Sequence, residues 1–146
     1  MGNVVKIGGI GATPTAVIGN FSSADDRQRL TKTALKAFMA LCESWAVADE
    51  VALELSGLDE DEWKMVRSPE YTLVLNQDQL TRVSALVGAF KGLNLLFADG
   101  FANKWPTTKN SGPLFGGATP VELMLAGGIP MMLKVRGHID ALRGGI

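Results

Sequence analysis

The sequence of 146 residues predicts an all-α protein, and two observations support this fold class. Over most of the chain, apolar residues recur three and four positions apart, which is the spacing of an amphipathic helix. Ser, Thr, Asp or Asn precedes these stretches, and Gly or Pro follows them, as at the starts and ends of helices. No internal repeat is present.

Residues 1–21 lack this pattern. They are rich in glycine and β-branched residues, so a flexible N-terminal arm is expected, with a short strand as the alternative. Within them, Gly9-Ile10-Gly11 resembles the start of a phosphate-binding loop. The third glycine of that motif is missing, and Gly-Lys followed by Ser or Thr occurs nowhere, so we prefer the arm.

Residues 22–75 contain three predicted helices joined by short turns. The expected ranges are 22–45, capped by Ser22 or Ser23, then Ala48–Leu55 and Asp59–Val66. Gly57 follows the second helix, and the third ends before Pro69 because the residue preceding a proline avoids helical backbone. A long helix, a short helix, a tight turn and a short helix have the proportions of a helix-turn-helix domain.

A second long helix is predicted from the cap Asn76 to Phe97, after the linker Tyr71–Leu75. Gly88 and Gly92 lie four residues apart on one face of this helix, where another helix could approach closely. A short helix around Phe101–Trp105, closed by Pro106, and a polar loop over 107–112 follow.

The run Gly116-Gly117-Ala118-Thr119-Pro120 predicts the start of another helix. The paired glycines end one segment, Thr119 caps the next, and Pro120 takes the first helical position, where its missing N–H costs nothing. We therefore assign a structural role to Gly116, Gly117, Thr119 and Pro120, which set the angle of the helices that follow. Gly127-Gly128 is predicted to break the helix, and Pro130 to begin a last one that reaches Arg143.

Composition indicates one small protein of the cytoplasm. The single cysteine, Cys42, excludes an internal disulfide and suits a reducing compartment. No run of apolar residues reaches the roughly 20 needed to cross a bilayer, and no secretory signal is evident. The net charge of −1 conceals an acidic middle, residues 46–66, and a basic C-terminal half.

The sequence offers little for catalysis, so no catalytic residue, metal site or cofactor is expected. The only histidine, His138, is expected on the exposed side of the last helix, and no acidic residue is placed to orient it. Cys42 falls in an apolar stretch and is expected to be buried and inert. The consecutive acids 59–62 spread around a helix start rather than converge on an ion.

DNA binding through the helix-turn-helix is disfavoured by charge. The helix that would enter the major groove begins with Asp59, Glu60, Asp61 and Glu62, which repel phosphates. Cations on the first helix could still contact a DNA backbone; these are Arg27, Arg29, Lys32 and Lys36.

The last helix is the better candidate for an interaction. Its apolar stripe comprises Met132, Val135, Ile139 and Leu142, and a second face carries Arg136, Asp140 and Arg143. Such a helix either docks on the core with a solvated polar side or presents its end to a partner. The terminal Arg143-Gly144-Gly145-Ile146 favours the second interpretation, because it is short and free to enter a cleft.

Five stretches carry a resemblance to a known family: Leu114–Met124, Ala126–Gly128, Val135–Gly145, Gln79–Arg82 and Lys91–Phe97. They resemble the toxin-binding domain of the Xre/MbcA/ParS antitoxin family, and residues 24–75 resemble its Xre-like helix-turn-helix portion to a lesser degree. The expected organisation is therefore an arm (1–21), a helix-turn-helix-like domain (22–75) and a toxin-binding domain (76–146).

The resemblance implies a type II antitoxin whose partner is a RES-domain toxin, an enzyme that uses NAD to ADP-ribosylate a target or that degrades NAD. It also implies that the C-terminal region covers the toxin's active-site cleft. The toxin-binding residues would be Arg136, Asp140, Arg143, Gly144, Gly145 and Ile146. The alternative is a DNA-binding regulator of its own operon, with operator DNA as partner. We also expect a homodimer, formed through the Gly88–Gly92 face or the apolar residues Val4–Ile10.

Overall fold

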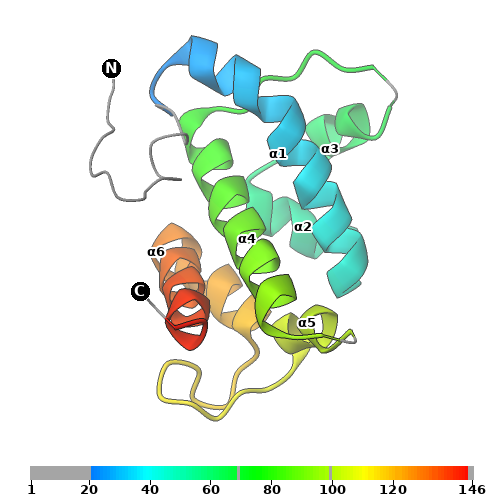
Figure 1. Ribbon diagram of the computed structural model, residues 1–146. Coiled ribbons are helices and arrows are strands. Elements are labelled where there is room, and N and C mark those ends of the chain that lie inside the picture. Colours follow the sequence, from blue (N-terminus) through cyan, green and yellow to red (C-terminus); the bar gives the residue numbers. More distant parts are fainter. Residues whose placement is uncertain (1–20, 69, 99, 145–146) are drawn as a thin grey trace, which may run out of the picture.

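The computed structural model describes residues 21–68, 70–98 and 100–144, which form helices joined by turns, without a strand (Figure 1). The prediction of an all-α protein is confirmed for this part of the chain. The elements are α1 (Ala24–Trp45), α2 (Asp49–Ser56), α3 (Glu60–Val66), α4 (Gln77–Leu96), α5 (Phe101–Lys104), the 3₁₀ helix η3 (Trp105–Thr107) and α6 (Pro120–Leu142). The predicted arm, apart from Phe21, lies outside the described residues.

Side chains fix the starts of the long helices where the sequence predicts them. Ser23 caps α1 and accepts a hydrogen bond from the backbone N–H of Asp26. At the starts of α3, α4 and α6, the side chain of the cap residue accepts a hydrogen bond from the backbone N–H of the third helical residue. The side chain of that third residue accepts one in return from the backbone N–H of the cap residue. These reciprocal bonds satisfy amides that the first turn of a helix leaves unpaired.

The central element is α4, which packs against α1 on one side and α6 on the other (Figure 1). The chain runs in the same direction through α1, α4 and the second half of α6. Near the start of α4, Thr31 Oγ1 accepts from the N–H of Leu75, and near its end the rings of Trp45 and Phe90 meet at 6.3 Å.

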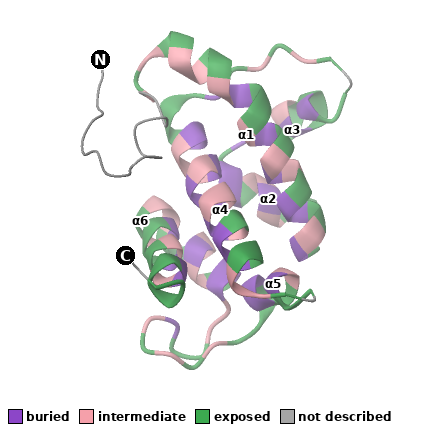
Figure 2. Cartoon of the chain, in the orientation of Figure 1, coloured by how far each residue is buried: buried purple, intermediate pink, exposed green. Residues whose placement is uncertain are grey.

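One hydrophobic core spans the predicted boundary between residues 75 and 76 (Figure 2). Its fully buried members include Leu35 and Phe38 from α1, Leu86 from α4 and Ile139 from α6. Residues 22–75 and 76–144 therefore share a core rather than each enclosing one.

Within α6 the backbone departs from helical geometry at Gly128, where φ is 65° and ψ is −151°. This region of backbone space is accessible essentially only to glycine. The predicted break at Gly127-Gly128 thus corresponds to a kink inside α6. Pro130 follows it closely, and a kink removes the clash between a proline ring and the carbonyl four residues earlier.

Candidate functional site

The second half of α6, after the Gly128 kink, carries most of the predicted interaction residues. Met132, Val135 and Ile139 of the apolar stripe are buried against the core, whereas Leu142 is 49% exposed. The stripe therefore packs the helix against the core over about two turns, from Met132 to Ile139, and the last turn of the helix, at Leu142, is exposed. The end of α6 lies at the surface beside the end of α4 (Figure 1).

Two glycines of α4 let α6 approach closely, as the sequence predicts. A Cβ atom added at Gly88 would overlap the Arg136 guanidinium, with Nη1 only 2.7 Å away, and one added at Gly92 would lie 2.9 Å from Ile139 Cγ2. The helix that uses this face is α6 of the same chain. The face is thus covered within one molecule and is not a free surface for the expected homodimer.

The predicted toxin-binding residues fall into two groups. Arg143 Nη1 pairs with Asp140 Oδ1 at 3.4 Å, and both side chains are largely exposed near the helix end. Arg136 lies two turns earlier, half-buried over Gly88, without a hydrogen-bond or ion-pair partner among the residues that the structure describes. Gly144 is exposed and follows the helix with φ 102°. Gly145 and Ile146 lie outside the described residues.

A groove between α1 and α4 meets α6 at Arg136, and the sequence does not predict it. The groove has a volume of about 260 Å³. Its apolar lining comes from Leu30, Ala34 and Ala37 of α1, from Leu80 and Val87 of α4, and from Phe21. Lys91 and Arg136 add two cations toward one end, and no acidic side chain is among the lining residues.

His138 is not on an exposed side of the helix, which corrects the expectation. Its ring is half-buried and stacks on Trp105, with centroids 6.3 Å apart and planes inclined by 12°. The edge-on ring of Phe115 lies 5.1 Å away. The reason is tertiary: η3 and the loop after it place both aromatic rings against α6.

The loop that precedes α6 is closed by backbone hydrogen bonds around the paired glycines. The N–H of Gly117 donates to the carbonyl of Asn110, and the N–H of Asn110 donates to the carbonyl of Ala118. Gly116 and Gly117 have positive φ values of 58° and 94°. This loop leads directly into the Thr119 cap and Pro120, so all four predicted structural residues lie where α6 begins.

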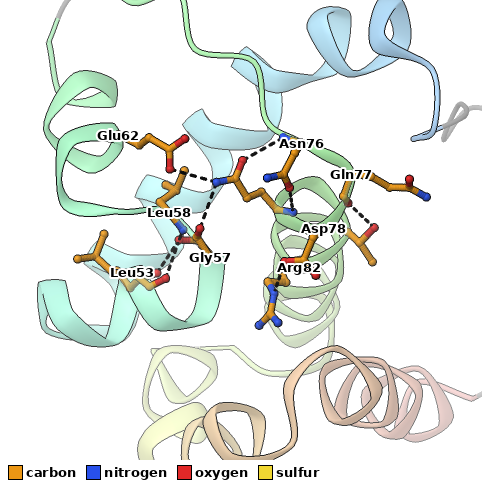
Figure 3. Close-up of polar contacts among 12 residues, drawn as sticks. Leu53, Gly57, Leu58, Glu62, Asn76, Gln77, Asp78 and Arg82 are labelled. Atoms are coloured by element: carbon orange, nitrogen blue, oxygen red, sulfur yellow. Dashed lines mark hydrogen bonds and ion pairs between the residues drawn. The ribbon is translucent and has the colours of Figure 1, made fainter.

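The turn between α2 and α3 and the start of α3 are tied to α4 through acidic and amide side chains (Figure 3). Gln79 Nε2 donates to the carbonyl of Gly57 and to Glu62 Oε1, each at 3.1 Å. The same Glu62 oxygen accepts from the N–H of Asp59, whose carboxylate caps α3. Two of the four acids at this helix start are therefore engaged within the fold, and Glu60 and Asp61 remain exposed.

Cys42 is 7% exposed, and burial raises the pKa of its thiol to about 12, with a smaller contribution from the nearby Asp49. A thiol with so high a pKa is a poor nucleophile at neutral pH. Across the described ranges, no three His, Cys, Asp or Glu side chains cluster as metal ligands would. Among the same residues, no helix combines the length and apolar character needed to cross a membrane.

The chain is similar to an uncharacterized protein of Sinorhizobium fredii strain NGR234, y4oB. The two are 28% identical over 116 residues, which cover 76% of this chain and 84% of that protein. No protein-family model matches the chain. No solved structure matches it. The name of this relative carries no function, so a function for the chain has to come from its own residues.

Proposed function

We propose that the protein is an antitoxin that neutralises a RES-domain toxin by covering the toxin's NAD-binding cleft. The observation that carries this proposal is the exposed end of α6. There Leu142, the Asp140–Arg143 pair and Gly144 stand at the surface beyond the last residue buried in the core, Ile139. The described residues of the stretches that resemble the antitoxin family lie on or directly beside α4 and α6 and on the loop before α6.

The chemistry of such a cleft suits this end. A site for the pyrophosphate of NAD presents cationic groups, which a carboxylate such as that of Asp140 can meet. Arg143 would then pair with acidic residues at the mouth of the cleft. The ion pair between Asp140 and Arg143 is exposed in the free protein, and exposed pairs contribute only about 0–1 kcal/mol. Opening it for a partner therefore costs little.

Co-expression with a RES-domain toxin, sought first in the gene next to that of this chain, tests the proposal. Deletion of residues 142–146 should abolish the rescue of growth, because the residues that enter the cleft are removed. Arg143→Gln should weaken rescue, whereas Lys134→Gln removes an exposed cation two turns earlier on the same helix and should not. Full rescue by the truncated protein would refute the proposal that the end of α6 enters the toxin's cleft.

Regulation through operator DNA is the weaker candidate, because the start of α3 is acidic. Of the four cations expected on α1, Arg29 pairs with Asp26 at 3.2 Å, Arg27 donates to the carbonyl of Phe21, and Lys32 lies over the ring of Tyr71. We expect no salt-sensitive mobility shift of the operon's promoter by the free protein. A tight shift that weakens with salt would reverse this ranking.

A further inference from the structure

Arg136 packs against α4, and no carboxylate among the described residues pairs with its guanidinium. The guanidinium rests on the backbone of α4 at Gly88, in space that any larger residue at that position would occupy. The side chain is half-buried, and none of the described residues accepts a hydrogen bond from it. A guanidinium presents five donors in a fixed fork that matches a carboxylate. One that is partly desolvated and unpaired therefore fits an acceptor supplied from outside the chain.

The surroundings of Arg136 define that acceptor further. Lys91, one turn beyond Gly88 on α4, is a second cation with no ion-pair partner in the described ranges, and it lines the same groove. Toward the other end, the lining is apolar and includes Leu30, Leu80 and Phe21. Leu80 and Lys91 are eleven residues apart on one helix, a distance of roughly 16 Å. The groove thus has an apolar part and a cationic part, the latter formed by Lys91 and Arg136.

We propose that this groove is a second docking site for the toxin, and that it takes a toxin segment carrying one large apolar side chain and one carboxylate. The inference rests on the proposed function, since it names a further contact with the same partner. A space of about 260 Å³ accommodates one or two side chains and is smaller than typical pockets for drug-sized molecules, which begin at about 300 Å³. The apolar side chain enters between α1 and α4, and the carboxylate meets Arg136 and Lys91.

Two parts of α6 then have separate roles. Arg136 binds outside the toxin's cleft and contributes affinity, whereas the end of the helix enters the cleft and blocks the enzyme. Arg143 follows Arg136 by seven positions, or about 10 Å along the helix. The two contacts can therefore be made at once and lost separately.

Isothermal titration of the full chain with a catalytically inactive form of the RES-domain toxin from which it rescues growth tests the inference. Arg136→Gln should raise Kd by at least about tenfold, the effect of losing a charged hydrogen bond. Gly88→Ala should act in the same direction, because its Cβ displaces the guanidinium while keeping the charge. Gly137→Ala is the matched control, since a Cβ there meets nothing within 4 Å. Circular dichroism verifies that each variant is folded.

The outcomes separate the two proposals. If the wild-type chain does not bind the toxin, the proposed function fails. If the wild type binds and Arg136→Gln binds equally well, the groove proposal is overturned while the antitoxin role stands. A toxin Asp or Glu whose change to Lys restores binding to Arg136→Glu would identify the carboxylate. Saturation of the groove by decanoate without loss of toxin binding would overturn the proposal in favour of a small-molecule site.

Discussion

At the scale of single residues, the close contact between α4 and α6 depends on two glycines of α4, Gly88 and Gly92, which have no side chain to keep α6 away. Gly92 faces Ile139, which has no exposed surface, and Gly88 faces the movable end of Arg136. A flexible guanidinium can shift, but a fully buried branched side chain packed between two helices cannot. The two glycines are therefore unequal, although the sequence presents them as a pair.

Gly92→Ala should lower the free energy of unfolding by about 1 kcal/mol. Overpacking a core costs about 1–3 kcal/mol, and the gain in helix propensity from alanine returns up to about 1 kcal/mol. Gly137→Ala, an exposed position on α6, should instead raise stability by about 0.5–1 kcal/mol. Urea denaturation of the two variants measures the difference, and equal stabilities would contradict the packing argument.

The Cys42 thiol predicts how stability depends on alkaline pH. Its folded-state pKa of about 12 lies above the unfolded value near 9, so above pH 9 the unfolded chain binds fewer protons than the folded chain. Stability should therefore fall between pH 9 and 12, by up to about 1.4 kcal/mol per pH unit from this group. The denaturation midpoint of the wild type should fall more steeply with pH in this window than the midpoint of Cys42→Ala. If the two midpoints had the same pH dependence, the pKa of the thiol would be the same in the folded and the unfolded chain.

The residues that the sequence does not place correctly are those whose surroundings come from distant segments. His138 has a helical spacing that suits an exposed face, but Trp105 and Phe115 cover it. Arg136 has the spacing of Asp140 and Arg143, yet its guanidinium is half-buried over Gly88 of α4, which leaves room for it, whereas Arg143 passes Gly92 and stays exposed. Periodicity gives the face of a helix, and only packing decides what meets that face.

At the scale of elements, local chemistry marks the helices well. The caps Ser23, Asn76 and Thr119 begin helices as predicted, since a side chain three residues from its partner amide needs no tertiary context. The break at Gly128 was predictable for the same reason, because backbone freedom is a property of glycine itself. The groove between α1 and α4 has no such local signature and could not be predicted.

Gly128→Ala tests whether the kink directs the second half of α6. With φ 65° and ψ −151°, an alanine there costs about 1–3 kcal/mol. We expect a lower melting temperature and a weaker affinity for the toxin, because a straighter helix no longer lies along α4. Gly137→Ala, on the same helix beyond the kink, is the control. A Gly128→Ala protein of wild-type stability and affinity would show that the kink is incidental.

At the scale of the whole molecule, the two predicted parts of the chain, residues 22–75 and 76–144, share one core, so neither is expected to fold without the other. Leu35 and Phe38 of α1 are fully buried in the same cluster as Leu86 and Ile139. Removing residues 1–75 would expose the face of α4 that α1 covers. The predicted division into a helix-turn-helix-like domain and a toxin-binding domain therefore does not coincide with two independent cores.

A fragment of residues 76–146 should not fold cooperatively. It loses the apolar partners of α4 on one side, and a chain of that size has little core to spare. Circular dichroism should show reduced helix content and a shallow thermal transition compared with the full chain. A sharp transition at the full-length temperature would mean that the C-terminal segment is an autonomous unit.

The parallel course of α1, α4 and the second half of α6 has an electrostatic consequence. Each helix carries about half a negative charge at its C-terminal end, and in a parallel set these ends gather at one pole instead of cancelling. The end of α6 lies at that pole (Figure 1). A partner whose surface is cationic, as a pyrophosphate-binding cleft is, would thus be attracted by the backbone itself before any side chain makes contact.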